Sequence, residues 1–194
     1  MESLQAGSVV LIAAIILFAL VSLFRAALFE EGALPLYLRA TAAGFASSLV
    51  LFAIMMLMVN GLGAAPFNMA PSAAFLETLG WNYGGLAPVS HFVYGVVWAL
   101  ILVAGFGRDV TMAKAVGVAV GAQWLLFMLI YAPAMGWGFF GLGGPAQSMA
   151  AQAPLHLGSP VKFLVMTLVL HIVYGAINGW LIPRRGAAGE ALAG

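Results

Sequence analysis

Apolar runs long enough to cross a lipid bilayer take up most of this chain, and they constrain its fold more than any other feature. A membrane-spanning helix needs about 20 consecutive apolar residues. Runs near that length occupy residues 8–28, 38–60, 88–107, 112–132 and 160–183. Hydrocarbon offers no water to the backbone, so such runs form helices. The sequence therefore predicts an all-α, multi-pass membrane bundle of five transmembrane helices.

The composition agrees with a single membrane domain over residues 1–194. Hydrophobic residues make up 64% of the chain and charged residues only 7%, whereas a soluble domain carries about 25% charged residues. The formal net charge of +1 lacks the basic footprint of a nucleic-acid-binding protein. The chain has no cysteine, which excludes disulfides and thiolate metal sites. We expect the lipid bilayer, not nucleic acid, as its partner.

The basic residues predict the orientation of the bundle, because cytoplasmic connections are enriched in Lys and Arg. With five spans, six of the 7 basic residues fall on one side and Lys162 falls on the other. The six are Arg25, Arg39, Arg108, Lys114, Arg184 and Arg185. This distribution predicts an N-terminus outside and a C-terminus in the cytoplasm.

Two long connections, residues 61–87 and 134–159, fall on the predicted outer side and are unusually apolar. Trp81 and Trp137 suit the headgroup region, where tryptophan is enriched. Three interpretations stay open for these connections. They fold down as a cap on the bundle, a partner subunit covers them, or they line an entry for a lipid or quinone.

A short phrase occurs twice within the predicted spans. Residues 91–95 read His-Phe-Val-Tyr-Gly, and residues 171–175 read His-Ile-Val-Tyr-Gly. Each phrase lies in a helix that follows an apolar outer connection and a helix with a strip of small residues. The strips are Ala40, Gly44 and Ser48 in the second helix and Ala113, Gly117 and Gly121 in the fourth. We therefore expect two parallel-repeat hairpins, helices 2–3 and 4–5, with an extra N-terminal helix.

Small residues one turn apart allow helices to approach closely in lipid. On this basis the sequence predicts a set of helix-packing glycines: Gly95, Gly117, Gly121, Gly175 and Gly179.

The repeated phrase supplies the candidate site, because residues i, i+3 and i+4 share a helix face and a histidine in a membrane usually has a partner or a function. His91 and Tyr94 form one polar patch, and His171 and Tyr174 form the other. The patches provide interhelical hydrogen bonds, ligate a b-type haem through His91 and His171, or bind a quinone or lipid headgroup. No catalytic residue stands out, and a metal is expected only if haem is bound.

The depths of the two histidines bear on the haem interpretation. Counted from Pro88 and Pro160, the histidines differ in depth by about 12 Å at 1.5 Å per residue. Counted from Arg108 and Arg184, they differ by about 6 Å. Two axial ligands of one iron need matching depths, so a single bis-histidine haem is not favoured.

Several short stretches in the second half of the chain resemble the YagU-like bacterial inner-membrane proteins. The similar stretches are residues 90–93, 117–123, 133–136 and 171–173, together with the Arg184-Arg185 end. The resemblance implies a helical protein of the bacterial inner membrane, in a family without an established reaction.

No acid lies deep in any predicted span, although pumps and proton-coupled transporters usually keep one there. We therefore expect a non-catalytic subunit or accessory protein of a larger membrane complex, with other membrane-protein subunits as partners. An energy-transducing complex is one candidate for this assembly. The alternatives are an electron-transfer protein that binds haem, another cofactor or quinone through His91 and His171, and a small transporter or lipid-binding protein.

Overall fold

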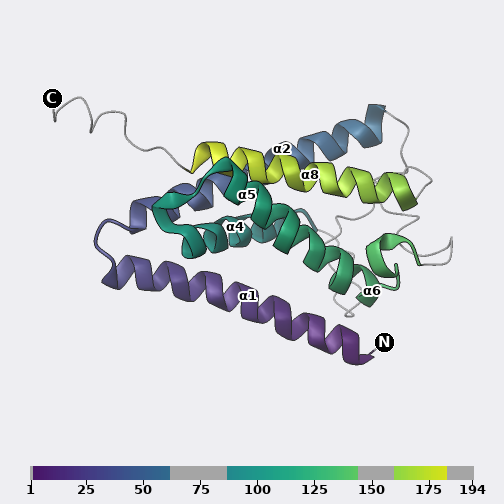
Figure 1. Cartoon of the computed structure of the whole chain (residues 1–194), viewed down its shortest axis with the longest axis horizontal. Coiled ribbons are helices and arrows are strands. Elements are labelled where there is room, and N and C mark those ends of the chain that lie inside the picture. Colours follow the sequence, from purple (N-terminus) through teal and green to yellow (C-terminus); the bar gives the residue numbers. More distant parts are fainter. Residues whose placement is uncertain (1, 62–86, 144–159, 183–194) are drawn as a thin grey trace.

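The computed structural model describes residues 2–61, 87–143 and 160–182, and within these ranges the chain is helical with no strand (Figure 1). The helices are α1 (Glu2–Phe29), α2 (Leu34–Gly61), α4 (Ala87–Phe106), α5 (Met112–Val118), α6 (Ala132–Ala134) and α8 (Pro160–Leu181). Two π-helical segments, Ala119–Trp124 and Phe127–Tyr131, join α5 to α6. Five helical stretches are long and apolar enough to cross a membrane. This confirms the predicted all-α, multi-pass membrane architecture.

The second helix begins earlier than predicted, at Leu34 instead of residue 38. Pro35 lies in its first turn, where proline's missing N–H removes no helical hydrogen bond. The fourth span likewise continues one residue past Pro133, to Ala134. Pro133 lies in the first turn of α6, which follows directly on the π-helical segment, so it does not end the helix.

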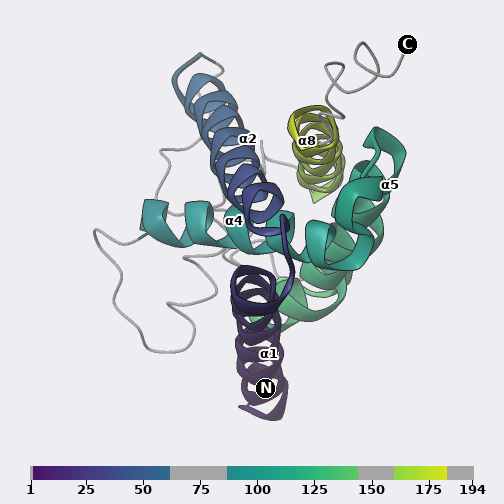
Figure 2. The same cartoon turned by 90° about the vertical axis from the view of Figure 1, so that its left-hand side faces the viewer.

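Two helix pairs, α2 with α4 and α5 with α8, make the most extensive contacts, and α2 also packs against α8. Helix α1 runs along one edge of the molecule and packs mainly on α4 (Figure 1). Figure 2 shows α4 lying crosswise to its neighbours, between α2 and α1. Because α4 is inclined to the other helices, a residue near its start can lie beside a residue further along a neighbouring helix.

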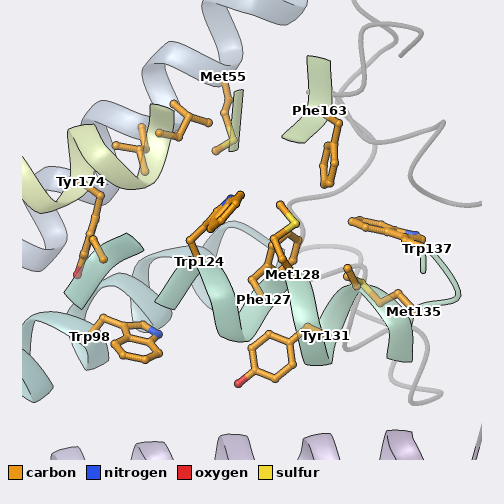
Figure 3. Packing of buried hydrophobic residues seen from close by; sticks show 14 of the residues in the cluster. Met55, Trp98, Trp124, Phe127, Met128, Tyr131, Met135, Trp137, Phe163 and Tyr174 are labelled. Atoms are coloured by element: carbon orange, nitrogen blue, oxygen red, sulfur yellow. The ribbon is translucent and has the colours of Figure 1, made fainter. Parts of the chain in front are cut away.

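The core contains a cluster of large side chains from α2, α4, the fourth span and α8, among them Trp98, Trp124, Phe127 and Tyr174 (Figure 3). A second cluster, built largely of alanine, valine and leucine, joins α1, α2 and α4. The small residues of the second cluster bring helix backbones together.

The connections between α1 and α2 and between α4 and α5 meet at one end of the bundle. Arg25 forms an ion pair with Glu30 at 2.9 Å, and the Arg108 guanidinium donates to the Gly32 carbonyl oxygen at 3.4 Å. Gly32 has a φ of +71°, which glycine adopts readily and which lets the chain reverse tightly after α1. Basic side chains from separate connections thus gather at this end.

The first part of the predicted outer connection 134–159 packs onto the bundle. Trp137 is only 1% exposed, and its ring lies 6.2 Å from Phe127 and 5.6 Å from Phe163, centroid to centroid. The Trp137 side chain therefore packs inside the bundle, and its position at headgroup depth stays a prediction. Residues 62–86, including Trp81, and residues 144–159 lie outside the described part of the chain.

Candidate functional site

A cavity of about 230 Å³ lies inside the bundle and is lined by all five spans. Both copies of the repeated phrase reach it, through His91 and Tyr94 of α4 and His171 and Tyr174 of α8. Helix α1 contributes an apolar wall of Ile12, Ile15 and Ile16. Two patches 80 residues apart in sequence therefore share one site.

The approach of α2 to α4 sets one side of this cavity. A Cβ on Gly44 would lie 2.8 Å from both the Gly95 carbonyl oxygen and the Ala99 Cβ. A Cβ on Gly95 would in turn overlap the Ser48 hydroxyl. A side chain at Gly44 would clash with the backbone of α4, and one at Gly95 would have to displace the Ser48 hydroxyl. This close approach brings the backbone of α2 within reach of His91.

Each histidine is oriented by a backbone carbonyl. The His91 ring makes a 3.0 Å hydrogen bond from Nε2 to the Ser48 oxygen of α2. The His171 ring makes a 2.7 Å hydrogen bond from Nδ1 to the Thr167 oxygen, one turn earlier in α8. Because a carbonyl oxygen only accepts, the bonded nitrogen must carry the proton in both rings.

Tyr174 and Asn178 tie α8 to the α2–α4 pair. The Tyr174 hydroxyl donates to the Gly95 carbonyl oxygen at 2.5 Å. The Asn178 amide donates to the Ser47 hydroxyl at 2.9 Å. Both contacts are buried, so they hold the helix that carries His171 in a fixed rotation about its axis.

The fourth span supplies Gln123, from the π-helical segment Ala119–Trp124. Gln123 is 4% exposed and lines the cavity. Its side-chain oxygen has no hydrogen-bond partner among the described residues, and neither has the Tyr94 hydroxyl. π-Helical turns in α-helices frequently mark functional sites, and here such a turn carries an unpaired amide oxygen to the cavity.

The predicted helix-packing glycines divide into two groups. A Cβ on Gly175 would lie 2.6 Å from Val116 Cα, and one on Gly179 would lie 2.5 Å from Met112 Cα. With Gly95, these glycines lie at close helix contacts. Gly117 and Gly121 are exposed, and a Cβ on either would meet nothing within 4 Å. In this chain Ala115 and Val116 approach α8 in place of Gly117 and Gly121.

The sequence predicted the four motif residues but not the groups that orient them. Ser48 was recognised only as a small residue, whereas its carbonyl holds His91. Thr167 carries no motif signal, yet its carbonyl holds His171 and its hydroxyl accepts from Trp124 Nε1 at 3.1 Å. Backbone carbonyls leave no mark in a sequence, so these partners emerge only from the packing.

The site offers little to a metal ion. Within the described ranges, no three or more His, Cys, Asp or Glu side chains are grouped closely enough to hold one. Comparison with known proteins adds nothing further, since no family model, curated protein or solved structure matches this chain.

Proposed function

We propose that this chain is a multi-pass protein of the bacterial inner membrane that binds a small, uncharged, amphipathic molecule inside its helix bundle. The observation that carries the proposal is the shared cavity, which both His-x-x-Tyr patches and Gln123 line within a mostly apolar wall. Mostly apolar cavities with a few convergent polar groups are typical ligand sites.

The lining selects against charged ligands. None of the described residues that line the cavity is Asp, Glu, Lys or Arg. An ion moved into this site from water would lose its hydration without gaining a counter-charge, which is costly in a medium of low dielectric constant. A neutral molecule that dissolves in the bilayer fits the site better.

The test fills the cavity from α1 and compares co-purified molecules by mass spectrometry. Ile16 lines the cavity, and its neighbour Leu17 is 61% exposed. Full-length wild type, Ile16→Trp and Leu17→Trp are extracted directly into native lipid nanodiscs. We expect a molecule enriched with wild type and Leu17→Trp but lost from Ile16→Trp. Equal recovery from all three proteins would contradict the proposal.

A haem ligated by both histidines fits this cavity poorly. The volume of about 230 Å³ is below the 300–1,000 Å³ typical of pockets for drug-sized ligands, and a tetrapyrrole is larger still. His91 also commits Nε2 to Ser48, which leaves only Nδ1 for a metal. An optical spectrum of wild type, His91→Ala and His171→Ala tests this directly, because a Soret band lost in both variants would restore the haem interpretation.

A second candidate function, an accessory subunit of a membrane complex, is favoured by one surface of the fourth span. Ala113, Gly117 and Gly121 are all exposed at one-turn spacing, and such small-residue strips often pack against other membrane helices. The test compares Gly121→Leu with Gly105→Leu on α4. A Cβ on Gly105, as on Gly121, would meet nothing within 4 Å, so neither substitution should disturb the bundle itself. Loss of a stoichiometric partner from Gly121→Leu alone would support this function. Identical partner profiles would count against it.

We also infer that α2–α4 and the fourth span with α8 are copies of one hairpin. The supporting contacts are similar: Gly44 lies between Gly95 and Ala99, and Ala115 lies against Gly175 and Gly179. When the two hairpins are aligned by these contacts, Gly44 corresponds to Ala115. The small-residue strips in the sequence instead align Gly44 with Gly117, two residues later. The π-helical segments that follow Val118 alter the helical register of the second copy only.

A further inference from the structure

The two histidines leave one nitrogen each without a hydrogen bond. Within the described part of the chain, no partner reaches His91 Nδ1 or His171 Nε2. Both rings line the cavity, so these two nitrogens are the ring atoms that remain for a ligand there.

The remaining nitrogens are acceptors. A neutral imidazole carries one proton, and the Ser48 and Thr167 carbonyls fix that proton on the opposite nitrogen of each ring. Reversing either tautomer would place a lone pair against a carbonyl oxygen and break the existing hydrogen bond. The two rings that line the cavity therefore keep one imidazole lone pair each, one from each copy of the motif.

The other polar groups of the cavity do not remove the need for a hydrogen-bond donor opposite the two histidines. The Tyr94 hydroxyl can donate and accept, and the Gln123 amide can offer either its oxygen or its nitrogen by rotating. The Tyr174 hydroxyl already donates to Gly95. A ligand that brings only acceptors would face the two histidine lone pairs directly, whereas a hydroxyl group would satisfy them.

The shape of the lining favours a ring. The aromatic side chains Tyr94, Phe127, Tyr131 and Tyr174 all border the cavity, and aromatic pairs gain from offset or edge contacts. The cavity volume suits one substituted ring instead of an extended ring system. The isoleucines of α1 provide an apolar border toward the lipid side for an attached hydrocarbon tail.

We propose that the cavity binds the hydroquinone form of a membrane quinone in preference to the oxidised quinone, with the ring hydroxyls donating to His91 Nδ1 and His171 Nε2. This inference rests on the proposed function, since it names the ligand class of the same site. It concerns binding alone: the ligand's two hydroxyls supply one donor to each of the two histidine acceptors.

The experiment measures equilibrium binding of a decyl-tailed ubiquinol and the matching ubiquinone to the full chain in lipid nanodiscs. Anaerobic dialysis followed by chromatography quantifies both forms. We expect the hydroquinone to bind about tenfold more tightly than the quinone, because a lost or mismatched hydrogen bond in a buried site changes affinity by about that factor.

Variants test the histidines individually. His91→Phe and His171→Phe keep a ring but remove the acceptor, so each should reduce hydroquinone affinity several-fold and leave quinone affinity nearly unchanged. Ile172→Phe is the matched control, because Ile172 neighbours His171 on α8 but is 40% exposed and does not line the cavity. The Ile172→Phe variant should bind the hydroquinone in preference to the quinone by the same factor as wild type.

The outcomes separate this inference from the proposed function. Equal affinities for the two forms, or a preference unaffected by both histidine variants, would overturn the hydroquinone assignment. Binding of decanol without either ring, abolished in Ile16→Trp, would overturn the assignment and support the broader proposal. If no probe binds and nothing co-purifies, both are overturned.

Discussion

At the scale of single residues, the interior is organised by side chains that donate to backbone carbonyls of neighbouring helices. His91 reaches Ser48, and Tyr174 reaches Gly95. Helix carbonyls already accept one bond within their own helix but retain a second lone pair. These contacts fix helix rotation without charged groups, which suits a chain whose interior lies at membrane depth.

Removing the Tyr174 hydroxyl should therefore loosen α8. Tyr174→Phe loses one buried hydrogen bond to Gly95, so we expect a loss of about 1 kcal/mol in the free energy of unfolding. Trp180→Phe is the control on the same helix, because Trp180 is 64% exposed. Unfolding in mixed micelles with increasing denaturing detergent measures both. A Tyr174→Phe curve that overlays wild type would show that the bond contributes nothing.

At the scale of helices, close approach depends on which glycines face a neighbour. Gly95 and Gly175 contact α2 and α5, whereas Gly105 and Gly117 face open space. The spacing of small residues does not distinguish these cases. Rotation of each helix about its axis decides them, and in the fourth span the contact to α8 falls on Ala115 and Val116.

Alanine substitutions should separate the two groups of glycines. Gly95→Ala and Gly175→Ala place a methyl group into a neighbouring backbone or side chain, so each should destabilise the bundle by about 1–3 kcal/mol. Gly105→Ala and Gly117→Ala should be neutral within about 0.5 kcal/mol. The same detergent titration tests all four variants. Similar losses at exposed and contacting positions would contradict the observed helix rotations.

At the scale of the whole molecule, the basic residues gathered at one end predict how the bundle lies in the membrane. Arg25 and Arg108 lie in or beside the connections at that end, and Lys162 lies near the start of α8. The N-out, C-in orientation remains a prediction from this asymmetry.

Cysteine labelling can test the orientation cleanly, because the chain has no cysteine of its own. Asp109→Cys reports on the connection after α4, and Val161→Cys reports on the start of α8, where Val161 is 60% exposed. A membrane-impermeant maleimide added to intact spheroplasts should label Val161→Cys at once and Asp109→Cys only after lysis. The reverse pattern would refute the N-out orientation.

The amino-acid sequence by itself determined the class of the fold and the approximate positions of the spans. Bilayer insertion depends on the apolar character of continuous stretches, which is a local and roughly additive property. The five predicted runs therefore correspond to five helical stretches. Their ends differ most at the start of α1, which begins at Glu2 instead of residue 8, and near Pro35 and Pro133, which lie in first turns.

Only the tertiary structure decided which residues meet. The sequence marked His91 and His171 but placed them at unequal depths, because counting along helices assumes that they run parallel to one another. The crosswise path of α4 (Figure 2) and the close contact at Gly44 and Gly95 place both histidines on one cavity. Helix crossing and rotation depend on packing between distant segments, and no pattern within a single span records them.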